Sequence, residues 1–193
     1  MNRTRKVVFI AAENGALPGG KVGGVADVVR DLPAALAEEG WAPTVVTPSY
    51  GKLHKLPGSE QIATVSTNFR DDRHEVSIWR VPGSFDTVEN LVFDHENFSV
   101  SGAGAIYDGG DPERPYATDA SKFAFFCAAV ASWIEESTEL PDLVHLHDWH
   151  SAFYCLLRSF SDDHRRLQDI RTVFTIHNVS YQGTRPLRGD DSS

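Results

Sequence analysis

Residues 7–48, VVFIAAENGALPGGKVGGVADVVRDLPAALAEEGWAPTVVTP, decide the fold class. They open with a continuous β-rich apolar run at 7–12, which is typical of a strand buried on both faces of a parallel sheet. A glycine-rich loop occupies 14–24, and apolar residues then repeat at helical spacing up to Gly40, a usual helix stop. A second β-rich run follows at 44–47. This order predicts a βαβ unit with a right-handed crossover.

The remaining segments continue the alternation of strands and helices. Pro33 lies inside the first helical pattern and predicts a kink or a split there. Short strand-like pieces within residues 60–100 indicate an antiparallel insert. The elements expected after it are a loop at 101–115, a helix at 118–136, a strand at 143–146, a helix at 149–160 and a strand at 171–176. The pattern predicts an α/β fold, a doubly wound Rossmann-like parallel sheet.

Composition restricts the partners and the compartment. The 193 residues fit one domain, and the net charge of -9 argues against nucleic acid and against an anionic membrane surface. No apolar run reaches the roughly 20 residues of a membrane span, and no signal peptide is evident. Cys127 and Cys155 lie in helix-like apolar stretches, where buried reduced thiols are expected. These features predict a cytoplasmic protein, for which a neutral partner such as a polysaccharide is compatible.

Three polar clusters follow predicted strands, at 15–27, 147–150 and 177–182. Ligands of doubly wound folds bind beyond the carboxyl ends of the strands, so the clusters predict one site at this edge. In the first cluster, glycines allow close backbone approach and Lys21 offers a charge for a phosphate or a sugar oxygen. A phosphate-loop NTPase is disfavoured because Val22 stands where a magnesium-binding hydroxyl is needed. A flexible turn with a solvated lysine is the other interpretation.

The second cluster contains His145, His147, Asp148, Trp149 and His150. Its order approaches a metallohydrolase signature, although the aspartate is out of register by one position. The cluster could also be structural. A sugar-binding set is the third possibility, since Asp and His bind hydroxyls and Trp stacks on a pyranose.

The third cluster contains His177, Asn178, Tyr181 and Gln182, directly after the last predicted strand. Uncharged hydrogen-bonding groups suit carbohydrate hydroxyls better than they suit charged substrates. No nucleophile elbow of the G-x-S-x-G kind occurs in the chain, so acyl transfer is not indicated.

In this order, the clusters resemble the glycogen and starch synthase family of retaining glucosyltransferases. The resemblance rests on the segments KVGGVADVV at 21–29, LPAAL at 32–36, PSY at 48–50, HDWHSA at 147–152 and TIHNVSYQG at 175–183. It implies the N-terminal half of a two-domain GT-B enzyme, with ADP-glucose as the usual donor and an α-1,4-glucan as the acceptor. It implies no metal and no other cofactor.

The resemblance also implies roles for individual residues. His177 would be the catalytic residue, with its main-chain carbonyl facing the charge that develops at the anomeric carbon. Lys21 and the backbone of Gly23 and Gly24 would touch the donor phosphates or nearby sugar oxygens. The full expected binding set is Lys21, Gly23, Gly24, Asp27, Asp148, Trp149, His150, Asn178, Tyr181 and Gln182.

Two departures from the family pattern affect the expectation. Ala120 and Lys122 stand where the family usually carries Asn and Arg, and a lysine cannot form a planar bidentate pair. The chain also ends at 188–193, in what should be a loop inside the first domain. We therefore expect residues 1–193 to be an incomplete acceptor-side domain, inactive alone, that lacks the C-terminal donor-binding domain unless a partner chain supplies it. A stand-alone glucan-binding module and a metal-dependent hydrolase are the rival interpretations.

Overall fold

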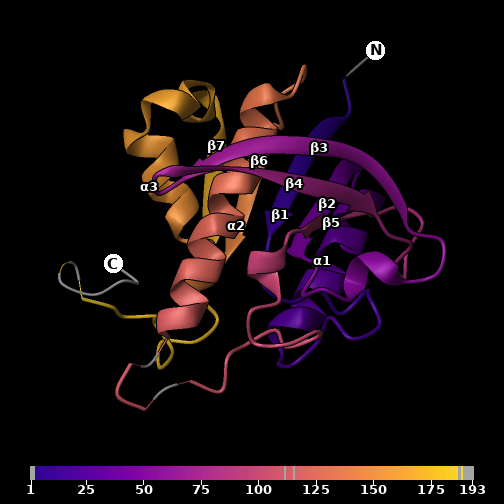
Figure 1. The fold of residues 1–193 in the computed structure, drawn as a ribbon. Coiled ribbons are helices and arrows are strands. Elements are labelled where there is room, and N and C mark those ends of the chain that lie inside the picture. The colour runs from indigo at the N-terminus through magenta and orange to yellow at the C-terminus, as the bar shows by residue number, and fades with distance from the viewer. Residues whose placement is uncertain (1–2, 111, 115, 187, 189–193) are drawn as a thin grey trace.

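The computed structural model describes residues 3–110, 112–114, 116–186 and 188, so the predicted end loop at 189–193 lies outside the described residues. The described part contains one mixed sheet with the strand order β3-β4-β5-β2-β1-β6-β7 (Figure 1). The strands are β1 (Arg5–Ile10), β2 (Trp41–Pro48), β3 (Glu60–Phe69), β4 (Asp72–Arg80), β5 (Glu89–Asp94), β6 (Leu143–His147) and β7 (Arg171–Thr175). The α-helices are α1 (Val25–Glu38), α2 (Ala117–Glu136) and α3 (Phe153–Phe160).

The sheet confirms the α/β prediction. Strands β5, β2, β1, β6 and β7 are parallel, and α1 makes the predicted crossover between β1 and β2. The expected antiparallel insert is the hairpin β3–β4, in which β4 pairs antiparallel with β5 and β3 forms an edge of the sheet. Strands β1, β6 and β7 are neighbours and run parallel, so their carboxyl ends lie along the same side of the sheet. The loops that follow these three strands therefore leave the sheet on that side.

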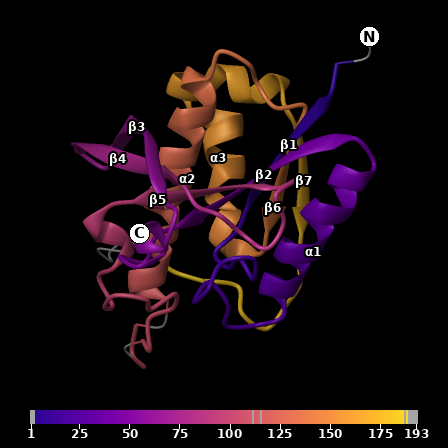
Figure 2. The same cartoon turned by 90° about the vertical axis from the view of Figure 1, so that its right-hand side faces the viewer.

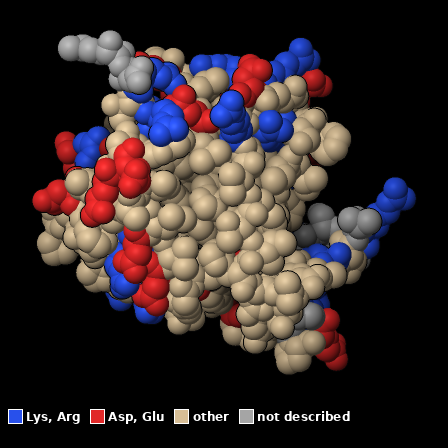
Figure 3. Space-filling view, turned by 180° about the vertical axis from the view of Figure 1, so that it is seen from behind, with Lys and Arg blue, Asp and Glu red and all other residues tan. Residues whose placement is uncertain are grey.

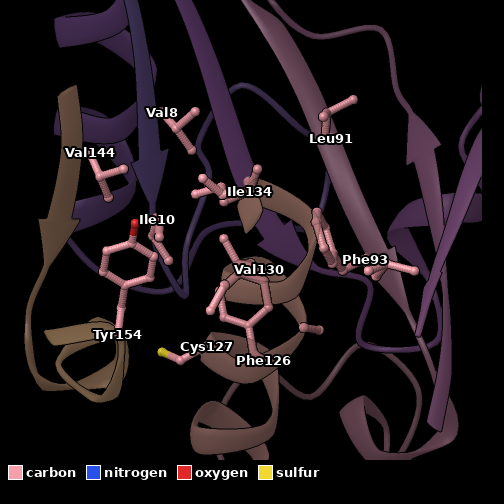
Figure 4. Packing of buried hydrophobic residues seen from close by; sticks show 14 of the residues in the cluster. Val8, Ile10, Leu91, Phe93, Phe126, Cys127, Val130, Ile134, Val144 and Tyr154 are labelled. Atoms are coloured by element: carbon pink, nitrogen blue, oxygen red, sulfur yellow. The ribbon is translucent and has the colours of Figure 1, made fainter. Parts of the chain in front are cut away.

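Helices cover both faces of the sheet (Figure 2). Helix α1 lies on one face, and α2 and α3 lie on the other. On the α2 side, Ile10 of β1 and Phe93 of β5 are completely buried together with Val130 of α2 and Tyr154 of α3 (Figure 4). On the α1 side, Phe9 belongs to a second buried cluster. Alternate residues of β1 thus face opposite layers, as expected for a central strand.

Two local predictions differ from the structure. Helix α1 is continuous through Pro33, so the predicted split is wrong. The ring of Pro33 is buried, and this burial offsets the hydrogen bond that a proline cannot donate. The helix predicted at 149–160 consists of a 3-10 turn at Trp149–Ser151 followed by α3.

The surface carries its charges in scattered groups. On the face opposite to that of Figure 1, Lys and Arg gather near the upper edge beside acidic residues, and a broad central area is uncharged (Figure 3). A continuous basic face, which nucleic-acid binding needs, is not present on this side. Within the described ranges, no helix has the length and apolar character required to cross a bilayer.

Candidate functional site

The three polar clusters meet where β1, β6 and β7 end. These strands are adjacent and parallel, and Asp148, directly after β6, donates its main-chain N–H to the carbonyl of Thr175 at 2.9 Å. A cavity of about 600 Å³ opens at this edge. Its lining consists of Glu13, Val22, Gly23, Gly24, Val25, Tyr107, Asp108, Gly109, Gly110, Pro112, Tyr116, Asp119, Asp148, Trp149, His150, Asn178 and Tyr181.

The cavity lining includes most, but not all, of the predicted site residues. The lining contains Gly23, Gly24, Asp148, Trp149, His150, Asn178 and Tyr181. The predicted residues outside the lining are Lys21, Asp27, His177 and Gln182. His177 nevertheless adjoins the cavity, because its main-chain N–H donates to the Asp148 carboxylate at 2.6 Å.

Lys21 is held away from the cavity by an acidic neighbour. Its Nζ lies 2.6 Å from the carboxylate of Asp27, which also pairs with Arg30 at 3.1 Å. The hydrogen bond from Lys21 lowers the pKa of Asp27. The lysine charge is therefore paired in this structure, and a phosphate would have to compete with Asp27 for it.

Glu13 is a site residue that the sequence interpretation missed. Its carboxylate is 3% exposed and accepts hydrogen bonds from the N–H groups of Val22 and Gly23, at 2.7 and 2.6 Å. The hydroxyl of Tyr107 also donates to it, at 2.7 Å. Burial and the Glu13 carboxylate raise the pKa of Tyr107 far above its ordinary value, so the phenol stays protonated. Glu13 thus joins the glycine-rich loop to the 101–116 segment, and its place directly after β1 was the available signal.

Aromatic rings form one wall of the cavity. The ring of Trp149 meets that of Tyr116 at 5.6 Å, and the ring of His150 meets those of Phe123 and Tyr107 at 4.7 and 5.2 Å. Burial, with a smaller contribution from Lys122, lowers the pKa of His150 to about 3. His150 is therefore neutral at pH 7.

A buried ion pair anchors the loop that carries Tyr107. Lys122 donates from Nζ to the carboxylate of Asp119 and to the carbonyl of Ile106, both at 2.7 Å. Asp119 in turn accepts from the N–H of Asp108 at 3.1 Å. Lys122, which stands where the resemblance predicts an arginine, is thus paired inside the protein.

Asp148 has an unusual backbone conformation. Its φ of 57° and ψ of -179° belong to a region that non-glycine residues rarely adopt. Its carboxylate accepts from the N–H of His177 and, at 3.4 Å, from that of Asn178. Such strain persists where surrounding contacts enforce it, and it is common at functional sites.

The histidines of the second cluster do not converge on one point. Nε2 of His145 lies 2.7 Å from the hydroxyl of Thr175, Nδ1 of His147 lies 2.8 Å from His177, and His150 packs among aromatic rings. In the described part of the chain, no three His, Cys, Asp or Glu side chains are arranged to hold a metal ion. The metallohydrolase interpretation therefore finds no support in the geometry.

The fold and the site define an α/β domain with a carboxylate-rich and aromatic cavity at the carboxyl edge of its sheet. The family model described as "Starch synthase catalytic domain" matches residues 6–192. The chain therefore belongs to the starch synthase catalytic domain family.

Similar proteins are longer than this chain. It is 37% identical to a glycogen synthase of Exiguobacterium sibiricum, over 94% of this chain and 36% of that protein. It is also 37% identical to a glycogen synthase of Gloeobacter violaceus, over 92% of this chain and 34% of that protein. The catalytic domain of starch synthase IV from Arabidopsis thaliana, bound to ADP and acarbose, superposes with a TM-score of 0.77 at 28% identity, over 94% of this chain and 35% of that chain. The chain thus spans about a third of the length of these relatives.

Proposed function

We propose that this chain is the acceptor-side part of a glucosyltransferase that extends an α-1,4-glucan from ADP-glucose with retention of anomeric configuration. Residues 1–193 would form an incomplete N-terminal domain of a two-domain enzyme. The nucleotide would be held mainly by a C-terminal donor domain, supplied by a longer chain or by a partner. No metal or other cofactor takes part in the proposed reaction.

The chemistry of the cavity carries this proposal. Its described lining offers four carboxylates (Glu13, Asp108, Asp119 and Asp148) and no lysine or arginine. A neutral polyol can donate its hydroxyls to these carboxylates and stack on the aromatic rings, whereas a diphosphate would need a cation from outside the lining, such as Lys21. Four lining aromatic residues are available for stacking: Tyr107, Tyr116, Trp149 and Tyr181.

Two N–H groups of the glycine-rich loop already have a hydrogen-bond partner, and this changes where a donor phosphate could bind on the loop. Because Glu13 already takes the N–H groups of Val22 and Gly23, a donor phosphate would meet Gly24 and the start of α1 rather than Gly23. Lys21 would leave Asp27 to contact that phosphate. The Arabidopsis neighbour was solved with ADP and acarbose, which supports a nucleotide and a carbohydrate as the ligands of the complete site.

The exposed edge of the sheet supports a larger functional unit. Strand β7 is an edge strand in which Val173 and Phe174 are 44% and 41% exposed, and Ile176 beyond it is 60% exposed. Apolar edges of this kind are normally covered. We place the rest of the first domain against this edge. Cys127 and Cys155 are free thiols, as is usual for cysteines in the cytoplasm. We include a cytoplasmic location in this proposal.

A transfer assay with two forms of the protein tests the proposal. The chain alone and the chain fused to the remaining part of a glycogen synthase relative, which supplies the rest of the first domain and the donor domain, are incubated with labelled ADP-glucose and glycogen. We expect incorporation by the fusion and none by the chain alone. Robust turnover by the chain alone would refute the proposal that a separate donor domain is required.

A binding titration separates the enzyme from a stand-alone glucan-binding module. Maltohexaose is titrated into the fusion with and without ADP. Mutual dependence of the two affinities is expected for an enzyme in which both ligands share one cleft. Glucan binding without transfer and without any effect of ADP would favour the module.

A further inference from the structure

Two imidazole rings meet edge to edge beside the cavity. His147 is the last residue of β6, and His177 lies just after β7. Nδ1 of His147 and Nε2 of His177 are 2.8 Å apart. The ring planes differ by 11° and the centroids are 5.1 Å apart, so the rings lie nearly in a common plane rather than face to face. This is the geometry of a hydrogen bond between two ring nitrogens, in which one nitrogen donates and the other accepts.

The environment of His147 decides which nitrogen donates. The residue is 1% exposed, and burial, assisted by His145 and His177, lowers its pKa to about 3. Neutral His147 therefore carries one proton at pH 7, on Nδ1 or on Nε2. Its Nε2 is buried and has no hydrogen-bond partner within the described residues. A proton on Nε2 would bury an N–H group without an acceptor, which folded proteins avoid more strictly than an unused acceptor.

We propose that His147 is a positioning residue for His177, donating Nδ1–H to Nε2 of His177 and so fixing its ring and its tautomer. Because Nε2 of His177 accepts in this arrangement, the ring proton of His177 lies on Nδ1. This nitrogen has no assigned partner in the described part of the chain, and it becomes the N–H donor that His177 presents to a ligand. The proposal rests on the proposed function, in which His177 lies beside the reacting sugar carbon.

The neighbouring residue completes the attachment. Asp148 accepts the main-chain N–H of His177 at 2.6 Å, and His147 holds the ring of the same residue. Consecutive residues at the end of β6 therefore constrain both the backbone and the side chain of His177. Catalytic groups whose orientation is fixed before the substrate arrives lose less entropy in the reaction.

A purely structural role for His147 makes a different prediction. The ring of His147 also packs against His145 and Phe9, with centroids 4.3 and 5.8 Å away. If packing were its only role, an aromatic hydrocarbon of similar size would serve as well. The tautomer of His177 would then be independent of residue 147.

The tautomer of His177 can be read directly by long-range ¹H–¹⁵N correlation of the ring nitrogens in the labelled chain at pH 7.5. We expect protonated Nδ1 and bare Nε2 in the unsubstituted chain. His147→Asn, whose side-chain amide N–H can occupy the place of Nδ1–H, should preserve this pattern. His147→Phe should lose it in favour of the Nε2–H form that free histidine prefers in water.

His145→Asn is the matched control, because His145 packs on His147 but bonds Thr175 instead of His177. The control should leave the His177 tautomer unchanged. The proposal is overturned by an Nε2–H signal for His177 in the unsubstituted chain, by an unchanged tautomer in His147→Phe, or by a changed tautomer in the control. If His147→Phe does not fold, the unsubstituted chain still tests the expected tautomer, and His147→Asn still tests whether a donor at position 147 maintains it. Neither ADP-glucose nor glucan enters the experiment, so its failure is distinguishable from failure of the transfer assay.

Discussion

The carboxylate of Asp148 accepts the main-chain N–H of His177 at 2.6 Å and thereby ties the end of β6 to the end of β7. The two residues come from different polar clusters of the sequence. Asp148 makes this contact from a backbone conformation with φ 57°. Such a conformation costs about 1–3 kcal/mol and persists where surrounding contacts, of which this hydrogen bond is one, enforce it.

Replacing Asp148 should destabilise the chain. Asp148→Ala removes the acceptor of His177 N–H and Asn178 N–H, and we expect a loss of about 1–3 kcal/mol in the free energy of unfolding. Asp148→Asn keeps an acceptor oxygen for the two N–H groups, so its loss should be smaller. Urea unfolding measures both. Asp27→Ala is the control, since its carboxylate is partly exposed and a surface pair contributes little. Equal losses at residues 148 and 27 would contradict this account.

Glu13 should control the order of two loops at once. Glu13→Ala removes the oxygen that accepts the N–H groups of both Val22 and Gly23, so we expect faster hydrogen exchange at these two residues and weaker maltohexaose binding. Tyr107→Phe removes only the hydroxyl that donates to Glu13. It should therefore leave exchange at Val22 and Gly23 unchanged. Faster exchange in Tyr107→Phe, or unchanged exchange in Glu13→Ala, would count against a carboxylate that bridges the loops.

The fold was predictable from the sequence because its signals are local. The apolar run that becomes β1, the helical spacing of α1 and the second run in β2 define a βαβ unit without tertiary information. The exact strand lengths in the hairpin were not predictable, since β3 and β4 extend far beyond the apolar pieces through cross-strand pairing. Continuity through Pro33 also depends on tertiary burial, which no local pattern reports.

The sequence could predict only those features of the site that follow from the order and direction of the strands. The rule that ligands lie beyond the carboxyl ends of parallel strands predicted Asp148 and His150 at that end of the sheet, and both line the cavity there. It could not show that Asp27 holds Lys21 at the surface, because that pairing depends on side-chain geometry. Tyr107 was missed because it comes from an irregular loop whose position is set by Asp119 and Lys122.

Gly183 should be intolerant of any side chain. It has φ 62°, and a Cβ at this position would lie 2.1 Å from the ring of Trp149. Gly183→Ala must therefore displace the indole from the cavity wall. We expect a change in tryptophan emission and a loss of maltohexaose affinity of about tenfold. A tenfold loss corresponds to roughly 1.4 kcal/mol of lost stacking. Gly40→Ala is the control, because Gly40 also has a positive φ (82°) but its Cβ would meet no atom within 4 Å and the residue lies outside the cavity lining, so it should change neither signal.

The buried pair of Lys122 and Asp119 should show strong coupling. Lys122→Met leaves a carboxylate buried without its cation, and we expect a loss of about 3–5 kcal/mol in the free energy of unfolding. The double variant Asp119→Asn with Lys122→Met removes both charges while an amide oxygen remains for the N–H of Asp108. It should recover much of the loss. A double variant no more stable than Lys122→Met would contradict the charge argument.

Acid should destabilise the chain before its carboxylates titrate. The pKa of His147 is about 3 when folded and about 6.5 when unfolded, so between these values the unfolded chain binds a proton that the folded chain does not. Stability is therefore complete above pH 6.5 and falls as the pH drops below it, with each such histidine contributing about 1.4 kcal/mol per pH unit.

The carboxylates with lowered pKa, such as Asp142, lose their contribution only below about pH 4, so the interval from pH 6 to pH 5 isolates the histidines. Burial lowers the pKa of His150 to about 3, so His150 also contributes to the decline of stability with falling pH. Urea unfolding at pH 7, 6 and 5 should show a shallower decline in His147→Asn than in the unsubstituted chain, because asparagine binds no proton in either state. Parallel declines would mean that His147 is already protonated in the folded chain at pH 5. In that state both of its ring nitrogens carry protons, and Nδ1 could donate to His177 only while a second, unpartnered N–H stayed buried.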